Sequence, residues 1–133
     1  MKPSLRLMTP EDRTFVHSSW HTSYWKLWAE SKVKRTIYST SQDKRIKRIL
    51  DKQIPTFIAF FHEAPSEILG WACVEGDTLH YIYVKAAYRK HGIGTVLMKS
   101  IGSTQYSHLT DSHGRRFLSK HNLTYNPYTL EQL

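Results

Sequence analysis

The chain has 133 residues, of which 40% are hydrophobic and 23% charged, and its formal net charge is +8 at pH 7. This length fits one domain, residues 1–133, with a core of its own, and the composition excludes a disordered chain. The single cysteine, Cys73, excludes an internal disulfide and a cysteine-based metal site, and the longest apolar run is too short to cross a bilayer. Because the N-terminus also lacks the apolar stretch of a secretion signal, we expect a cytoplasmic protein.

The first third of the chain predicts one strand and two helices. Leu5–Leu7 has the composition of a short strand, and Thr9 followed by Pro10 is a helix start. Apolar residues at helical spacing indicate the first helix: Val16, Trp20, Tyr24, Leu27 and Trp28. A second helix is expected from Ser41 to Lys52, because Ile46 and its neighbours form an apolar side before Pro55.

The rest of the chain predicts a meander of strands followed by alternating helices and strands. β-branched and aromatic residues between short turns indicate three strands at Thr56–Phe61, Ile68–Glu75 and Thr78–Val84. Helical spacing from Ile93 to Ile101 predicts a third helix, which Gly102 ends. The final elements are expected to be a strand at Tyr106–Thr110, a helix at Arg115–His121 and an extended segment at Leu123–Tyr128. The predicted class is therefore α/β of the α+β type.

Positive charge is concentrated in residues 26–52, which hold nine Lys or Arg against three Asp or Glu, a net charge of +6. Such a field attracts anions, so a nucleic acid, a phosphorylated cofactor or an acidic partner fits it. The alternative is a solvated helix face with no partner. The sequence alone does not separate the two.

The most informative segment is a strand that runs through a basic loop into a helix with two glycines at its start. Arg89, Lys90 and His91 precede Gly92 and Gly94. A helix N-terminus presents unpaired N–H groups and the positive end of the helix dipole, and glycine lets a phosphate approach the backbone closely. The segment therefore predicts a diphosphate cradle. The alternative is a helix start without a ligand, with solvated basic residues beside it.

The motif Arg89-x-x-Gly92-x-Gly94, preceded by Tyr83-Val84-x-x-x-Tyr88, resembles the acetyl-CoA signature of the GNAT superfamily of N-acetyltransferases. The predicted order of elements, β-α-α-β-β-β-α-β-α-β, is also similar to that fold. The resemblance implies a GNAT-like, mostly antiparallel mixed sheet flanked by helices. It further implies acetyl-CoA as cosubstrate and an amine as acceptor.

The resemblance also implies a set of cofactor-binding residues. Amides between Lys90 and Thr95 would bind the pyrophosphate, the strand 82–84 would pair with the pantetheine, and an N–H near Ile82 would polarise the thioester carbonyl. That strand would have to separate from its neighbour after Tyr106. The full set is Ile82, Tyr83, Val84, Arg89, Lys90, His91, Gly92, Ile93, Gly94 and Thr95.

The chain departs from the family's pattern where the proton donor is usually found. Members often carry a tyrosine one position after an aromatic residue in the next helix, and here Leu118 follows Phe117. The same segment has Asp111 where Asn is usual and Gly114 where Ala is usual. Tyr125 is the first candidate to replace the donor. The alternatives are Tyr128 as the donor, or departure of the thiolate without a proton donor.

His80 lies in the third meander strand, near the place where the family often has a general base, and its ordinary pKa suits that task. The alternative is a half-buried histidine with a local hydrogen bond. No histidine spacing indicates a metal, and Cys73 reads as a core residue rather than a nucleophile.

Three functions follow from these patterns. The first is transfer of an acetyl group from acetyl-CoA to a primary amine. The second is the same fold acting on a nucleic acid, either a DNA base or a tRNA, as the basic second helix suggests. The third is a module that binds acyl-CoA without turnover, as Leu118 suggests. The identity of the acceptor and the oligomeric state are not encoded in these motifs.

Overall fold

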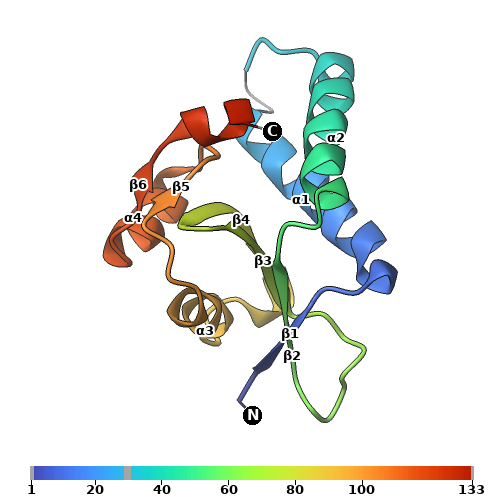
Figure 1. The fold of residues 1–133 in the computed structure, drawn as a ribbon, viewed down its shortest axis with the longest axis vertical. Coiled ribbons are helices and arrows are strands. Elements are labelled where there is room, and N and C mark those ends of the chain that lie inside the picture. Colours follow the sequence, from blue (N-terminus) through green and yellow to red (C-terminus); the bar gives the residue numbers. More distant parts are fainter. Residues whose placement is uncertain (1, 29–30, 133) are drawn as a thin grey trace.

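The computed structural model describes residues 2–28 and 31–132 and shows a six-stranded sheet between two layers of helices (Figure 1). The strands lie in sequence order across the sheet. Pairs from β1 to β4 are antiparallel, whereas β4–β5 and β5–β6 are parallel. The strand bounds are β1 Ser4–Leu7, β2 Thr56–Phe60, β3 Gly70–Glu75, β4 Thr78–Val84, β5 Gln105–Tyr106 and β6 Thr124–Tyr125.

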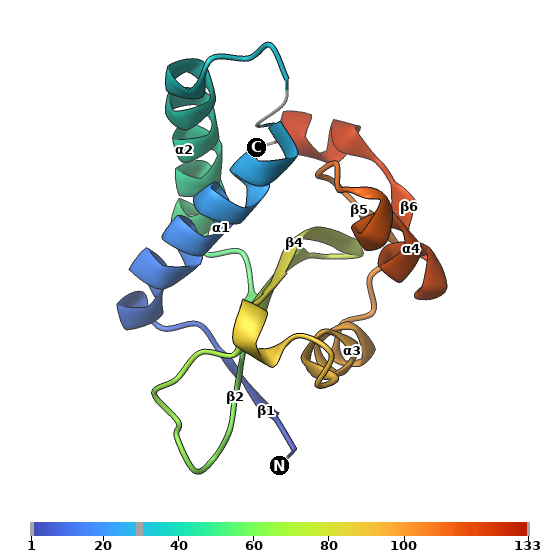
Figure 2. The ribbon, with the colours of Figure 1, turned by 180° about the vertical axis from the view of Figure 1, so that it is seen from behind.

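In the described residues four α-helices cover the sheet, and three short 3₁₀ turns precede α1, precede α3 and follow β6. The helix bounds are α1 Arg13–Trp28, α2 Arg35–Asp51, α3 Ile93–Ser100 and α4 Ser112–Lys120. The 3₁₀ turns are Pro10–Asp12, Ala86–Tyr88 and Pro127–Gln132. Seen from both sides, α1 and α2 lie on one face of the sheet and α3 and α4 on the other (Figures 1 and 2). None of the described helices is long and apolar enough to span a bilayer.

Two hydrophobic cores lie on opposite faces of the sheet because side chains alternate along each strand. In β3, Trp71 and Cys73 point to the α1/α2 side, and Ala72 and Val74 point to the α3/α4 side. Cys73 is fully buried, as the sequence indicated, and burial raises the pKa of its thiol to about 12.

The predicted mixed α/β class and the order of elements are confirmed, but several bounds were wrong. Helix α2 begins at Arg35 rather than Ser41, because Tyr38 packs under α1 and its hydroxyl donates to the carbonyl of His21 at 2.8 Å. Helix α4 begins before Arg115, because the carboxylate of Asp111 accepts the N–H of Gly114 at 2.7 Å and caps the first turn.

The strand bounds also differ from the prediction. The strand expected at Ile68–Glu75 begins at Gly70, and the strand expected at Tyr106–Thr110 is β5, only two residues long. The strand expected at 56–61 ends at Phe60. The predicted extended segment Leu123–Tyr128 is strand only at β6, and the chain then turns into a 3₁₀ helix that starts at Pro127.

The short β5 leaves most of β4 without a partner on that side. β5 pairs with β4 only at Thr78 and Leu79, so residues 80–84 of β4 have no partner strand on that edge. This confirms the expected separation of the two strands after Tyr106. The β3–β4 register also shifts there, because His80 is an extra residue between the pairs formed by Leu79 and Tyr81.

Candidate active site

The turn into α3 presents main-chain N–H groups that are not used by the protein. Gly92 has a left-handed backbone (φ 81°, ψ 6°), and Lys90 also has a positive φ of 67°. In the part of the chain that the structure describes, no hydrogen bond comes from the N–H groups of residues 90–95. These groups therefore point away from the protein at the positive end of the helix dipole, where an anion binds well.

The two glycines of the motif are required for different reasons. A Cβ on Gly92 would touch nothing within 4 Å, so the positive φ is what favours glycine there. A Cβ on Gly94 would lie 3.3 Å from the ring of Phe117 on α4. Gly94 thus lets α4 approach α3 closely and keeps the space beside the free N–H groups open.

A cavity of about 400 Å³ opens at this turn, between the end of β4, α3 and α4. It holds eight of the ten residues that the sequence assigned to the cofactor: Ile82, Val84, Arg89, Lys90, Gly92, Ile93, Gly94 and Thr95. Tyr83 faces the α1 side of the sheet, where it lines a second cavity, whereas His91 is exposed and lines none of these cavities.

A second cavity, of about 450 Å³, continues from the first toward α1 and the segment between β5 and α4. Both cavities are lined by Ile82, Val84, Arg89, His113 and Gly114, so they form two ends of one groove. We call the part beside α3 the α3 end and the part beside α1 the α1 end. The groove follows the edge of β4 that β5 leaves free.

The register of β3 and β4 turns the main-chain groups of Ile82 into this groove. The N–H of Lys85 donates to the carbonyl of Leu69 at 2.9 Å, so Val84 and Gly70 between them form a non-hydrogen-bonded pair. The alternation makes Ile82, two residues earlier, a non-hydrogen-bonded residue as well, with its N–H and C=O directed away from β3. Arg89 is tied to the same edge, because its Nε donates to the carbonyl of Val84 at 3.1 Å.

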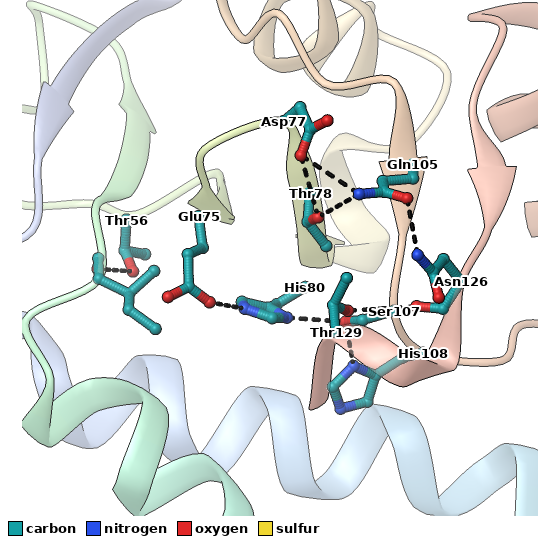
Figure 3. A network of polar contacts seen from close by, with 11 residues as sticks. Thr56, Glu75, Asp77, Thr78, His80, Gln105, Ser107, His108, Asn126 and Thr129 are labelled. Carbon is teal, nitrogen blue, oxygen red and sulfur yellow. Dashed lines mark hydrogen bonds and ion pairs between the residues drawn. The ribbon is translucent and has the colours of Figure 1, made fainter. Parts of the chain in front are cut away.

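His80 is held in a polar network and also lines a small cavity of about 80 Å³ beside β4. It is only 1% exposed; its Nε2 lies 2.9 Å from Glu75 Oε1 and its Nδ1 lies 2.7 Å from Ser107 Oγ (Figure 3). Burial lowers the pKa of His80, and the neighbouring Glu75 opposes part of that shift. Glu75, the last residue of β3, is thus a partner of His80.

Tyr125 lies on β6 with its ring 5.4 Å from that of Tyr106, and it is not among the residues that line the groove. The tyrosines of the α1 end are Tyr24, Tyr81 and Tyr83, which sequence reasoning did not select as proton donors. The hydroxyl of Tyr81 lies 2.8 Å from Ser23 Oγ, and burial raises its pKa to about 12. The sequence could have indicated these tyrosines, because side chains alternate along β4 and both Tyr81 and Tyr83 therefore face α1.

Leu118, which stands where the family usually has a tyrosine, is buried in the core on the α3/α4 side. It contributes to a small cavity of about 80 Å³ at the point where β4 and β5 separate. Gly114 lies on the same helix, α4. It has no room for a side chain, because a Cβ there would lie 2.0 Å from Thr110 Oγ1.

Comparisons with known proteins bear on the family and the fold of the chain. Residues 17–101, more than half of the chain, match the model of the acetyltransferase (GNAT) family. A search of curated proteins found no match.

Three solved structures illustrate the similarity in fold. A GCN5-related N-acetyltransferase from Rhodopseudomonas palustris has a TM-score of 0.60 at 19% identity, over 90% of this chain and 80% of that one. Apo YjaB from Escherichia coli has a TM-score of 0.55 at 18% identity, over 75% of this chain and 64% of that one. YncA, a putative acetyltransferase from Salmonella typhimurium solved with acetyl-CoA, has a TM-score of 0.51 at 15% identity, over 76% of this chain and 61% of that one. At these identities the similarities establish the fold, and the chain spans less than two thirds of YjaB and YncA.

Proposed function

Because the chain belongs to the acetyltransferase (GNAT) family, whose cosubstrate is acetyl-CoA, we propose that it transfers the acetyl group to a primary amine. The observation that carries the proposal is the set of unused N–H groups between Lys90 and Thr95, which open onto a cavity. A diphosphate offers oxygens that these groups can hold, and the neighbouring Arg89 and Lys90 supply positive charge.

The groove also has the shape that a long, narrow cosubstrate needs. From the α3 end, the pantetheine arm would run along the free edge of β4, where the main-chain groups of Ile82 are available for hydrogen bonds. The N–H of Ile82 would then stand beside the thioester carbonyl. A fixed main-chain donor stabilises the negative charge that develops on that oxygen during attack by the amine.

The α1 end is the proposed place for the acceptor amine. It is lined by Ser23, Tyr24 and Tyr81, whose hydroxyl groups can position an amine and supply a proton to the departing thiolate. A structure of AAC(6')-Iy in complex with the bisubstrate analogue CoA-S-monomethyl-acetylneamine (TM-score 0.51, 15% identity) has a similar fold, and it supports an amine as the acceptor class. The sequence-based assignment of His80 to catalysis remains a proposal, and that of Tyr125 remains the alternative to Tyr81 as proton donor.

We also propose that residues 1–133 act as one domain and that the protein works in the cytoplasm. Packing of all strands into one sheet supports the first proposal. The lone buried Cys73 suits a reducing compartment and supports the second.

The proposed function is tested by binding and by turnover. Acetyl-CoA is expected to raise the melting temperature, because a ligand that binds only the folded state stabilises it. The Arg89→Ala variant is expected to lose much of this shift, whereas Lys99→Ala removes an equal charge at the other end of α3 and is the matched control.

Turnover is measured as release of free thiol from acetyl-CoA with a panel of primary amines, and mass spectrometry identifies the product. An acetylated amine is the expected result. Binding of acetyl-CoA without acetylation of any amine would instead indicate a module that binds the cosubstrate only. Absence of both binding and turnover would refute the proposal.

A further inference from the structure

Four polar side chains form a continuous line from the surface to the place where β4 and β5 separate. Glu75 Oε1 lies 2.9 Å from His80 Nε2, and His80 Nδ1 lies 2.7 Å from Ser107 Oγ. Ser107 Oγ in turn lies 3.0 Å from His108 Nδ1. Figure 3 shows His80 between Glu75 and Ser107, with His108 beyond Ser107. We call these four residues the relay.

One end of the relay is exposed to solvent, and the other end is buried. The side chain of Glu75 is 47% exposed, whereas His80, Ser107 and His108 are each at most 4% exposed. At the buried end, His108 Nε2 is buried and has no hydrogen-bond partner in the described structure. A buried polar atom without a partner is costly, so such an atom calls for a ligand or a function.

The unpartnered nitrogen belongs to a residue at the inner end of the groove. His108 lines the cavity of about 80 Å³ at the separation of β4 and β5. That cavity shares Tyr81, Ile82, Leu109 and Thr110 with the α1 end of the groove. It therefore adjoins the place proposed for the acceptor amine.

Counting protons fixes the direction of the hydrogen bonds. Ser107 has one hydroxyl proton, so it donates to one imidazole Nδ1 and accepts an N–H from the other. When Glu75 is ionised it accepts the Nε2–H of His80, which leaves His80 Nδ1 as the acceptor for Ser107. His108 must then carry its proton on Nδ1, and its buried Nε2 holds a free lone pair.

We propose that the relay carries the proton of the acceptor amine to the surface during acetyl transfer. This inference rests on the proposed function. The ammonium proton passes to His108 Nε2, the Nδ1 proton of His108 passes to Ser107 Oγ, and the hydroxyl proton of Ser107 passes to His80 Nδ1. The Nε2 proton of His80 then passes to Glu75, which releases it to water. The free amine is left to attack the thioester.

A relay solves the problem that a single buried base would meet here. Burial lowers the pKa of His108 to about 3, with further contributions from the nearby Arg45 on α2 and from His80. Tyr24 on α1 and Tyr81 on β4, whose rings contact that of His108, are neutral at pH 7, and burial raises their pKa values further. An imidazolium is therefore unfavourable at this position. In the relay each ring gains one proton as it loses another, so both histidines end neutral.

The tautomers of the two histidines test the relay without any acceptor. Nitrogen-15 NMR at pH 7 is expected to show His108 protonated on Nδ1 and His80 protonated on Nε2. A His108→Asn variant assigns the signals. If His108 carries its proton on Nε2, that nitrogen has no lone pair to offer and the inference is overturned.

The kinetic test compares two acids of the β3–β4 turn. Glu75→Gln keeps an oxygen that accepts the His80 N–H but cannot take up a proton. It is expected to lower kcat about tenfold or more, at unchanged KM for acetyl-CoA and unchanged melting temperature. The matched control is Asp77→Asn, because Asp77 contacts Thr104 and Gln105 rather than the relay.

Glu75→Asp, which restores a carboxylate, is expected to recover part of kcat. A Glu75→Gln variant with the kcat of the wild type would overturn the relay. If the wild type acetylates no amine in the panel, the proposed function fails. The tautomer measurement still supports or overturns the hydrogen-bond directions in the relay.

Discussion

The two ends of the groove are built from different parts of the chain. The α3 end consists mainly of main-chain N–H groups, which Gly92 and Gly94 leave accessible. The α1 end and the relay behind it consist of side chains from distant segments, such as Tyr81 of β4 and His108 beyond β5. A backbone site suits a cosubstrate that a whole family shares. A side-chain site is where one member can differ from another.

The largest expected effect comes from filling the α3 end. Gly94→Leu places a side chain against Phe117 and into the space beside the free N–H groups. We expect acetyl-CoA binding to weaken at least a hundredfold, which corresponds to about 2.7 kcal/mol, as measured by isothermal titration calorimetry. Gly102→Leu is the matched control, because a Cβ on Gly102 meets nothing within 4 Å. Wild-type affinity in Gly94→Leu would mean that the cosubstrate binds elsewhere.

The next effect is the pH dependence of stability that the buried His108 is expected to cause. The pKa of His108 is lowered to about 3, whereas an unfolded histidine titrates near its ordinary value of 6.5. Between these values the unfolded state binds one more proton than the folded state, so stability falls as pH decreases below about 6.5. We expect this group to contribute a slope of about 1.4 kcal/mol per pH unit.

The measurement is the free energy of unfolding by denaturant at several pH values between 6.5 and 4. His108→Asn is expected to flatten the curve, because Asn does not titrate there and its amide can still contact Ser107. His113→Asn, the same substitution at an exposed position on α4, is the matched control. Equal slopes in wild type and His108→Asn would show that His108 is not the group held neutral.

A smaller effect distinguishes the two tyrosines proposed as proton donor. Tyr81→Phe removes a hydroxyl from the α1 end of the groove, and Tyr125→Phe removes one from β6. We expect Tyr81→Phe to lower kcat about tenfold without changing the KM for acetyl-CoA, and Tyr125→Phe to match the wild type. The opposite pattern would favour the assignment made from the sequence.

The same contrast explains what the sequence could predict. Arg89, Gly92 and Gly94 lie in one segment, so the α3 end was predicted from neighbouring residues alone. The relay joins Glu75, His80 and His108, and no local pattern shows that these side chains meet. The tertiary contact of Tyr38 with α1 likewise moved the start of α2 away from its predicted position. Sequence reasoning selected His80 from its place in the strand, but it missed Glu75 and His108, whose contacts depend on distant parts of the chain.

The smallest expected effect concerns the helix that both ends of the groove share. Helix α4 contributes His113 and Gly114 to each end, and its first turn is held by the carboxylate of Asp111. Asp111→Ala should lower the free energy of unfolding by about 1 kcal/mol, because the N–H of Gly114 loses its capping acceptor. Asp111→Asn retains an acceptor oxygen and is expected to cost less. We also expect both variants to bind acetyl-CoA more weakly, because the first turn of α4 lines the cavity at the α3 end. A loss of stability with full affinity would show that α4 supports the fold but does not shape the groove.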